Sequence, residues 1–300
     1  MYLTNTFYKV TIIFNMKSIK HIFLICLTIT TFISCDSDDP EIAGPDPLES
    51  YEEFNISYGT DNDQVFDLYL PFGRTLETKT LILVHGGGWT SGDKGDMNAF
   101  KDYIKTQMPN YAVVNMNYRL ADDNNPPYPM QINDITSVVN YLQNNQNDYV
   151  ISEEIGFVGV SAGAHLSLLW SYAFDTENKA EMVCSVVGPT NFTDPAYLDN
   201  IDNPILQELI NTIGVDSSIP FLEEVSPYHQ VTAAAPPTIL FYGGQDPLIP
   251  TTQGTAMRDK LQEFNVIHEF TLYPEEGHGW IGLNLLDTSV RLKAFIETHL

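Results

Sequence analysis

Gly159-Val160-Ser161-Ala162-Gly163 is the stretch of the 300-residue sequence that decides the fold. It ends an apolar run, Ile155–Val160, whose length predicts a short buried strand, and it precedes residues 162–174, where apolar side chains recur at helical spacing. A serine on such a sharp turn exposes its hydroxyl, and only glycine fits where the neighbouring backbone passes closely on either side. The pattern predicts a nucleophile elbow. A plain Gly/Ser turn between a strand and a helix is the alternative.

Strands and helices alternate along the sequence on both sides of this turn. Residues 54–58 and 65–70 predict a hairpin. Apolar runs and helical periodicity predict further strands at 81–84, 111–118, 182–187, 238–242 and 269–273, and helices at 96–108, 129–142, 252–264 and 288–299. Because strands that alternate with helices form parallel sheets covered on both faces, the predicted fold class is α/β with a mostly parallel sheet.

Residues 189–237 interrupt this alternation. They have weak periodicity and many Asn, Asp and Pro residues, with one short helix predicted near 205–213. A segment of this length is too long for a simple turn. We therefore expect a small cap insertion over the site.

Residues 1–35 predict an export signal. They contain no Asp or Glu, a basic segment begins at Met16 (a possible true start), and the apolar run 22–33 is too short to span a bilayer comfortably. Phe32-Ile33-Ser34-Cys35 resembles a bacterial lipobox, which implies cleavage before Cys35 and lipidation of its thiol. An ordinary signal peptide or a buried helix is the alternative. We expect a secreted bacterial lipoprotein, anchored at the outer-membrane surface or the periplasmic face.

Residues 36–50 are acidic, rich in proline and without periodicity, so they predict a disordered tether ahead of a catalytic domain at 51–300. The tether resembles a surface-export signal, and a solvated linker is the alternative. The chain has 39 Asp and Glu against 14 Lys and Arg, which argues against nucleic acid or anionic membranes as partners. Membrane contact is expected only through the N-terminal lipid. Cys26 and Cys35 belong to the export signal, so Cys184 should be a free buried thiol.

Two later residues complete a candidate catalytic set with Ser161. A serine hydroxyl needs a base within hydrogen-bond reach and a group that orients this base. After a nucleophile elbow the expected order along the chain is serine, acid, histidine. Asp246 follows the predicted strand 238–242, and His278 follows the last predicted strand, so both should lie at the carboxyl ends of strands. Asp246 alone could be a turn residue before proline, but the order predicts a Ser161–His278–Asp246 triad.

The sequence His85-Gly86-Gly87-Gly88-Trp89 follows another predicted strand. The oxyanion of an acyl-transfer intermediate is best held by fixed backbone N–H groups, which glycines can present without side chains in the way. We expect Gly87 and Gly88, with Ala162, to form the oxyanion hole. A phosphate-binding loop is disfavoured because the Gly-Lys-Ser/Thr sequence of the Walker pattern is absent.

The chain resembles α/β-hydrolase-fold carboxylesterases, and most closely the family that unites hormone-sensitive-lipase-like esterases with bacterial feruloyl and acetyl-xylan esterases. The matching motifs cover nearly all of residues 51–300 in order. They are Asp67-Leu-Tyr-Leu-Pro71, His85-Gly-Gly-Gly-Trp-Thr-Ser-Gly-Asp-Lys94, Asn117-Tyr-Arg-Leu120, Tyr128-Pro-Met-Gln-Ile-Asn-Asp134, Gly159-Val-Ser-Ala-Gly-Ala-His-Leu166, Gly244-Gln-Asp246 and Gly277-His-Gly279. The resemblance implies Ser161 as nucleophile, His278 as base and Asp246 as orienting acid, without a cofactor or metal.

The expected function is hydrolysis of small or polysaccharide-linked carboxylic esters through an acyl-enzyme. The prediction that it removes acetyl or feruloyl groups from plant polysaccharide rests on the resemblance and on the expected location. Trp89 and Trp280 are candidate walls of the substrate pocket, and core packing is the alternative for Trp89. A peptidase or an arylformamidase of the same fold is an alternative. A non-catalytic, glycan-binding surface lipoprotein is a third reading, against which the intact triad argues.

Overall fold

The computed structural model describes residues 44–199, 203, 209, 211–213 and 218–300. The predicted export signal at 1–35 lies outside the described residues, and so does most of the helix predicted near 205–213. The predictions for these segments therefore remain predictions.

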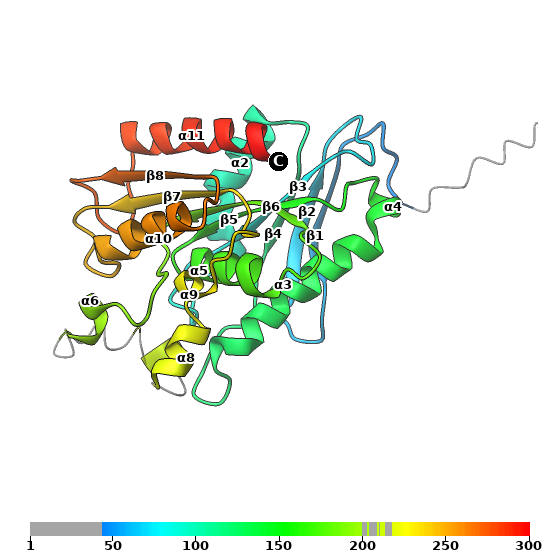
Figure 1. Ribbon diagram of the computed structural model, residues 1–300. Coiled ribbons are helices and arrows are strands. Elements are labelled where there is room, and N and C mark those ends of the chain that lie inside the picture. The colour runs from blue at the N-terminus through cyan, green and yellow to red at the C-terminus, as the bar shows by residue number, and fades with distance from the viewer. Residues whose placement is uncertain (1–43, 200–202, 204–208, 210, 214–217) are drawn as a thin grey trace, which may run out of the picture. The chain divides into compact units, whose positions relative to one another are not determined.

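A single twisted sheet forms the centre of the described chain (Figure 1). Its strand order is β1-β2-β4-β3-β5-β6-β7-β8. The strands are β1 (Tyr51–Ser57), β2 (Val65–Leu70), β3 (Thr80–Val84), β4 (Ala112–Met116), β5 (Ile155–Val160), β6 (Ala180–Val186), β7 (Thr238–Gly243) and β8 (His268–Tyr273). The pairs β1–β2 and β2–β4 are antiparallel, and the other neighbouring pairs are parallel. The predicted hairpin and the mostly parallel sheet are confirmed.

Helices cover both faces of this sheet (Figure 1). The helices are η1 (Lys94–Met97), α2 (Asn98–Gln107), α3 (Pro127–Asn144), α4 (Gln146–Tyr149), α5 (Ala162–Leu169), η2 (Trp170–Phe174), α6 (Pro195–Leu198), α8 (Ile219–Glu224), α9 (Pro227–Gln230), α10 (Thr251–Glu263) and α11 (Leu283–His299). Helices α2 and α11 lie on one face, and α3, α5 and α10 lie on the other.

The alternation of side chains along a strand explains why one sheet needs helices on two faces. In β3, Leu81 and Leu83 pack into the core beneath α2 and α11, whereas Ile82 and Val84 pack into the core beneath α3 and α5. All four side chains are fully buried. A strand that is apolar at every position is therefore the expected signature of this two-sided core, and the predicted fold class is confirmed.

The short helices α6, α8 and α9 in the region 189–237 were not predicted. Each has four to six residues, which is too short for a hydrophobic period to be read. Each carries a proline in its first turn, at Pro195, Pro220 and Pro227, a position where proline is favoured because its missing N–H costs no helical hydrogen bond. These prolines, together with Asp194, Ser218 and Ser226 at the N-cap positions, were the sequence signals of the helices.

The predicted tether extends too far into the domain. Arg74 holds residues 44–50 against the folded domain. Its guanidinium donates to the carbonyl oxygens of Pro45 and Glu49 in this segment and, at 2.7 Å, to the carbonyl oxygen of Tyr149 in α4. The Arg74 side chain is buried, and this burial lowers its pKa. The sequence could not show this contact, because the anchoring residue lies far along the chain from the segment it holds.

Cys184 lies fully buried in β6, within the core beneath α11, and burial raises the pKa of its thiol. The predicted free core thiol is confirmed.

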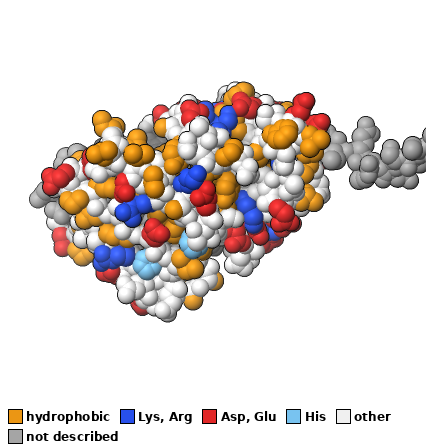
Figure 2. All heavy atoms as spheres, turned by 90° about the horizontal axis from the view of Figure 1, so that it is seen from above, with side chains coloured by type: hydrophobic (Ala, Val, Ile, Leu, Met, Phe, Trp, Pro, Cys, Tyr) orange, Lys and Arg blue, Asp and Glu red, His pale blue; other side chains and the backbone are white. Residues whose placement is uncertain are grey.

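Helix α11 leaves an apolar outer surface at Leu283, Leu286 and Val290. On the face seen in Figure 2, hydrophobic side chains are mixed with charged side chains of both signs. Within the described part of the chain, no helix combines the length and apolarity needed to cross a membrane.

Candidate active site

Ser161 occupies a strained turn between β5 and α5. Its φ of +52° and ψ of −119° lie outside the regions that residues with a side chain usually adopt. A Cβ added at Gly159 would lie 2.5 Å from the carbonyl oxygen of Gly163, and one added at Gly163 would lie 2.2 Å from that of Val84. Only glycine fits at these two positions, as the sequence predicted. The turn is a nucleophile elbow in its geometry.

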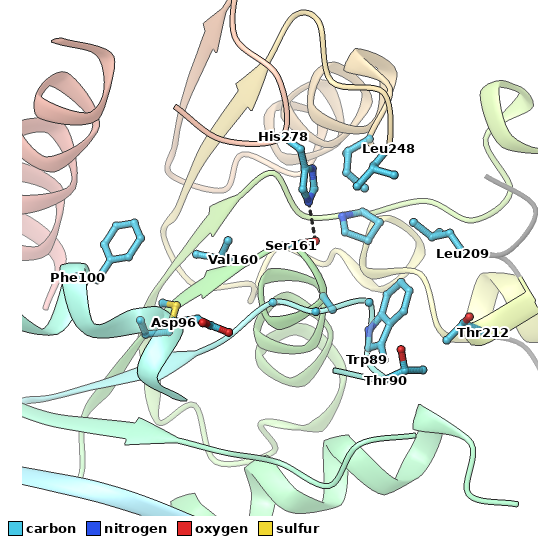
Figure 3. Close-up of a pocket in the computed structure, with 17 residues that line it drawn as sticks. Trp89, Thr90, Asp96, Phe100, Val160, Ser161, Leu209, Thr212, Leu248 and His278 are labelled. Carbon is cyan, nitrogen blue, oxygen red and sulfur yellow. Dashed lines mark hydrogen bonds between the residues drawn. The ribbon is translucent and has the colours of Figure 1, made fainter. Parts of the chain in front are cut away.

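The structure brings the three predicted triad residues together. His278 Nε2 lies 2.9 Å from Ser161 Oγ (Figure 3), and His278 Nδ1 lies 2.7 Å from Asp246 Oδ2. The other carboxylate oxygen of Asp246 accepts the N–H groups of Leu248 at 2.8 Å and Ile249 at 3.0 Å. An ionised carboxylate can only accept, so Nδ1 carries the imidazole proton and Nε2 is free to accept the serine proton.

The glycine loop after β3 lies beside Ser161. Gly87 and Gly88 have φ values of +118° and +57°, and a Cβ on Gly87 would lie 2.0 Å from the carbonyl oxygen of Ser91. Both glycines line the same pocket as Ser161 and Ala162, the first residue of α5, whose N–H has no partner within its helix. No hydrogen bond among the described residues uses the N–H of Gly87 or Gly88. All three amides are therefore placed near the serine, and their role as oxyanion donors stays a prediction.

A pocket of about 620 Å³ opens at Ser161 and His278 (Figure 3). Most of its wall is apolar. The apolar lining residues are Trp89, Met97, Phe100, Val160, Pro189, Leu209, Leu248 and Ile249. Leu209 belongs to the predicted cap region, so this region contributes to the wall. Such a pocket suits an uncharged, largely apolar group next to the nucleophile.

Of the two tryptophans predicted to line the substrate pocket, Trp89 and Trp280, one lies in its wall and the other does not. Trp89 lines the pocket and is also almost completely buried, packing against Phe192, so both readings of this residue hold. Trp280 does not line the pocket. Its ring packs against Tyr273 at 4.9 Å between centroids, and its Nε1 donates to Thr288 Oγ1 at 2.8 Å. The prediction for Trp280 is wrong because the chain turns toward α11 immediately after the catalytic loop.

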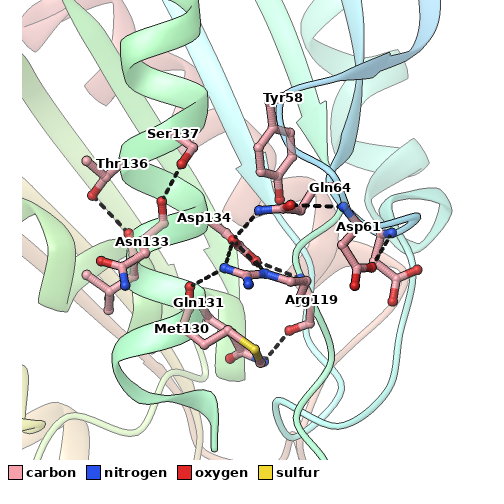
Figure 4. Close-up of polar contacts among 12 residues, drawn as sticks. Tyr58, Asp61, Gln64, Arg119, Met130, Gln131, Asn133, Asp134, Thr136 and Ser137 are labelled. Carbon is pink, nitrogen blue, oxygen red and sulfur yellow. Dashed lines mark hydrogen bonds and ion pairs between the residues drawn. The ribbon is translucent and has the colours of Figure 1, made fainter. Parts of the chain in front are cut away.

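A polar network around Asp134 of α3 joins Gln64, Arg119 and Gln131 (Figure 4), and Gln131 extends it to the glycine loop. The fully buried Asp134 accepts from Arg119 Nη2 at 2.6 Å and from Gln64 Nε2 at 2.9 Å. Gln131 Nε2 then donates to the carbonyl oxygens of Arg119 at 2.8 Å and of Trp89 at 2.7 Å. No role for Gln131 was predicted from the sequence. Its only signal was its place in the motif Tyr128–Asp134.

Replacing Gln131 by methionine should slow the reaction without weakening substrate binding. Methionine fills the same volume but cannot donate to the Trp89 carbonyl oxygen, so the amides of the glycine loop lose a restraint. This restraint matters most when negative charge develops on the carbonyl oxygen of the substrate. We expect kcat to fall about tenfold, with KM changed less than threefold. Asn133→Met, on the exposed side of the same helix, is the matched control. Equal effects on kcat and KM in Gln131→Met would contradict this positioning role.

His165 links the glycine loop to the cap region. Its Nδ1 accepts from Trp89 Nε1 at 3.2 Å, and its Nε2 donates to the carbonyl oxygen of Val225 at 2.8 Å. The ring is almost completely buried, and this burial lowers the pKa of His165 to about 4. The imidazole is therefore neutral at pH 7 and serves as a structural bridge.

This buried histidine should make stability depend on pH. The unfolded chain binds a proton at His165 below about pH 6.5, whereas the folded chain binds it only near pH 4. The free energy of unfolding should therefore fall by about 3 kcal/mol as the pH drops from 7 to 4, on account of this residue. Urea unfolding of the wild type and of His165→Gln at several pH values measures the contribution. The same pH slope in both proteins would contradict it.

The sheet order, the elbow and the Ser161–His278–Asp246 geometry define an α/β-hydrolase fold. Residues 66–261, about two thirds of the chain, match the model of the BD-FAE family, and the chain belongs to this family.

Comparison with individual proteins agrees with this class. The chain is 24% identical over 254 residues to Esterase LipC of Mycobacterium tuberculosis, covering 77% of this chain and 60% of LipC. It is also 24% identical to dipeptidyl aminopeptidase BIII of Pseudoxanthomonas mexicana, covering 80% of this chain and 35% of that protein. The chain thus spans less than two thirds of the length of these relatives. A solved truncated carbohydrate esterase from gut microbiota superimposes with a TM-score of 0.67 at 18% identity, covering 84% of this chain and 98% of that one.

Proposed function

We propose that the protein is a serine carboxylic ester hydrolase that acts through an acyl-enzyme. The observation that carries this proposal is the hydrogen-bonded series Ser161 Oγ, His278 and Asp246, which opens into a largely apolar pocket. Relatives named as esterases support it. No step in this chemistry requires a metal or an organic cofactor.

The geometry supports a two-stage reaction. Ser161 Oγ attacks the ester carbonyl carbon while His278 Nε2 takes the hydroxyl proton, and Asp246 stabilises the imidazolium that forms. The carbonyl oxygen becomes an oxyanion, for which the loop and helix amides beside the serine are the available donors. His278 then protonates the leaving alcohol. Water, deprotonated by the same histidine, releases the acid and regenerates Ser161.

For the substrate, we propose acetyl or feruloyl esters carried on plant polysaccharide. The pocket of about 620 Å³ accommodates either acyl group, and the similarity in fold to a carbohydrate esterase is consistent with such a substrate. Export of the protein as a lipoprotein anchored through Cys35 would bring it to this material. Metabolic labelling with a radioactive fatty acid tests the anchor, because a Cys35→Ser variant should carry no label.

The decisive test combines turnover and covalent labelling of the full chain. We expect hydrolysis of p-nitrophenyl acetate, butyrate or octanoate and of acetylated or feruloylated xylan. A p-nitrophenyl phosphonate ester should inactivate the protein and leave a phosphonyl group on Ser161, located by peptide mass spectrometry. A dipeptidyl p-nitroanilide tests the peptidase alternative, which the match to the aminopeptidase raises. Labelling of Ser161 with turnover of the anilide alone would replace the esterase by a peptidase.

A further inference from the structure

A second cavity adjoins the catalytic pocket. It has a volume of about 450 Å³ and shares Thr90 and Thr212 with the pocket at Ser161. Its remaining wall comes largely from the loop between β4 and α3, where Asp122, Asp123 and Asn124 precede Pro126. In Figure 3, Thr90 and Thr212 lie on the far side of Trp89 from Phe100. The two cavities thus meet at the glycine loop.

The second cavity differs in chemistry from the first. Carboxylates, amides and hydroxyls line it, together with two proline rings, and none of its described lining residues is Lys or Arg. An anionic ligand therefore finds no counter-charge there. Carboxylate and amide oxygens accept hydrogen bonds from hydroxyl groups, and proline rings offer an apolar surface to the C–H face of a sugar ring.

Two polar side chains of this loop are available to a ligand. Asp122 Oδ1 accepts the backbone N–H groups of Asn124 at 2.8 Å and of Asn125 at 2.9 Å, which fixes the turn. The side chains of Asp123 and Asn124 are exposed, and neither makes a side-chain hydrogen bond within the described part of the chain. A rigid turn thus holds one carboxylate and one amide toward the cavity.

Backbone hydrogen bonds join this cavity to the reacting centre. The N–H of Thr90 donates to the carbonyl oxygen of Gly87 at 3.2 Å, and that of Ala121 donates to the carbonyl oxygen of Trp89 at 2.9 Å. Because the two cavities share Thr90 and Thr212, a group bound in the second cavity would adjoin an ester bound at Ser161. We infer that this cavity binds the hydroxylated alcohol part of the substrate, a neutral sugar, while the acyl group lies in the apolar pocket. The inference rests on the proposed esterase function and deepens it.

The double variant Asp123→Ala/Asn124→Ala tests the sugar site. We expect kcat/KM on acetylated xylobiose to fall about tenfold, the loss of one or two hydrogen bonds to hydroxyls, and to stay within twofold on p-nitrophenyl acetate. The matched control is Asn147→Ala/Asp148→Ala in α4, which removes the same two groups at the other end of α3. It should leave both substrates within twofold of the wild type.

The outcomes separate this inference from the proposed function. Equal kcat/KM of variant and wild type on the sugar ester, or wild-type turnover of small esters without turnover of any acetylated oligosaccharide, would overturn the sugar site and leave the esterase standing. A larger loss on acetylcholine than on acetylated xylobiose would replace the sugar by a cationic alcohol. Absence of Ser161-dependent turnover on every ester would instead overturn the proposed function itself.

Discussion

Ser161→Ala is expected to lower kcat on p-nitrophenyl acetate by about 10⁵-fold or more while the protein stays folded. Removing Oγ eliminates the atom that would form the acyl-enzyme. His278 Nε2, which lies 2.9 Å from Oγ in the wild type, then has no nucleophile to activate. Loss of a nucleophilic serine in a triad abolishes nearly all of the chemical rate and leaves only the contribution of binding and of the oxyanion donors. Stopped assays over hours, with the uncatalysed rate subtracted, measure the residual activity of the variant.

Two controls make this result specific. Ser171→Ala, also on the helical segment that follows the elbow, removes a buried hydroxyl without a hydrogen-bond partner among the described residues, so its kcat should stay within twofold. Thermal unfolding of Ser161→Ala should match the wild type within a few degrees, since the Ser161 backbone strain is carried by the turn and not by Oγ. Residual activity above one per cent of the wild-type rate would show that another group attacks the ester.

The sequence was sufficient where a residue's local surroundings determine its conformation. Gly159 and Gly163 could be assigned because a Cβ at either position collides with neighbouring backbone, a steric rule that needs no knowledge of distant contacts. The order of Ser161, Asp246 and His278, which follow β5, β7 and β8, could be converted into proximity, because the carboxyl ends of parallel strands share one edge of the sheet.

The sequence was insufficient where the position depends on partners far along the chain. Trp280 was a candidate wall of the substrate pocket, yet its indole N–H donates to Thr288 on α11. Gln131 looked like one polar residue on an amphipathic helix, although its amide holds the carbonyl oxygen of Trp89, 42 positions away. Neither contact follows from periodicity, and the motif that contains Gln131 does not show which group its amide binds.

The cap region shows a third cause. Its helices α6, α8 and α9 have four to six residues, so tertiary contacts and not intrinsic helical stability hold them. One such contact is made by the buried Gln253 of α10, whose Nε2 donates at 2.8 Å to Oδ2 of Asp194, the N-cap residue of α6. Segments stabilised in this way follow from the packed domain, and their own residues predict little.

Asp246→Asn is expected to lower kcat by about 10⁴-fold at neutral pH, with KM nearly unchanged, because it imposes the wrong histidine tautomer. The N–H groups of Leu248 and Ile249 both point at Oδ1 of Asp246, so the amide oxygen of an asparagine must take that place. The amide NH₂ then faces His278 Nδ1 and donates to it. The proton moves to Nε2, which can no longer accept the Ser161 proton.

Two variants serve as controls for the tautomer effect. Asp246→Ala offers no donor to His278 Nδ1, so the imidazole can still place its proton there, and this variant should be less impaired than Asp246→Asn. Asp194→Asn changes another buried aspartate, which binds Thr252 and Gln253 away from the triad, and its kcat should stay within threefold. Comparison of kcat for the three variants between pH 6 and 9 tests whether Asp246 sets the tautomer of His278. If Asp246→Asn retained more than a tenth of the wild-type kcat, the base would not depend on Asp246 for its tautomer, and the acid of the triad would have to be sought elsewhere.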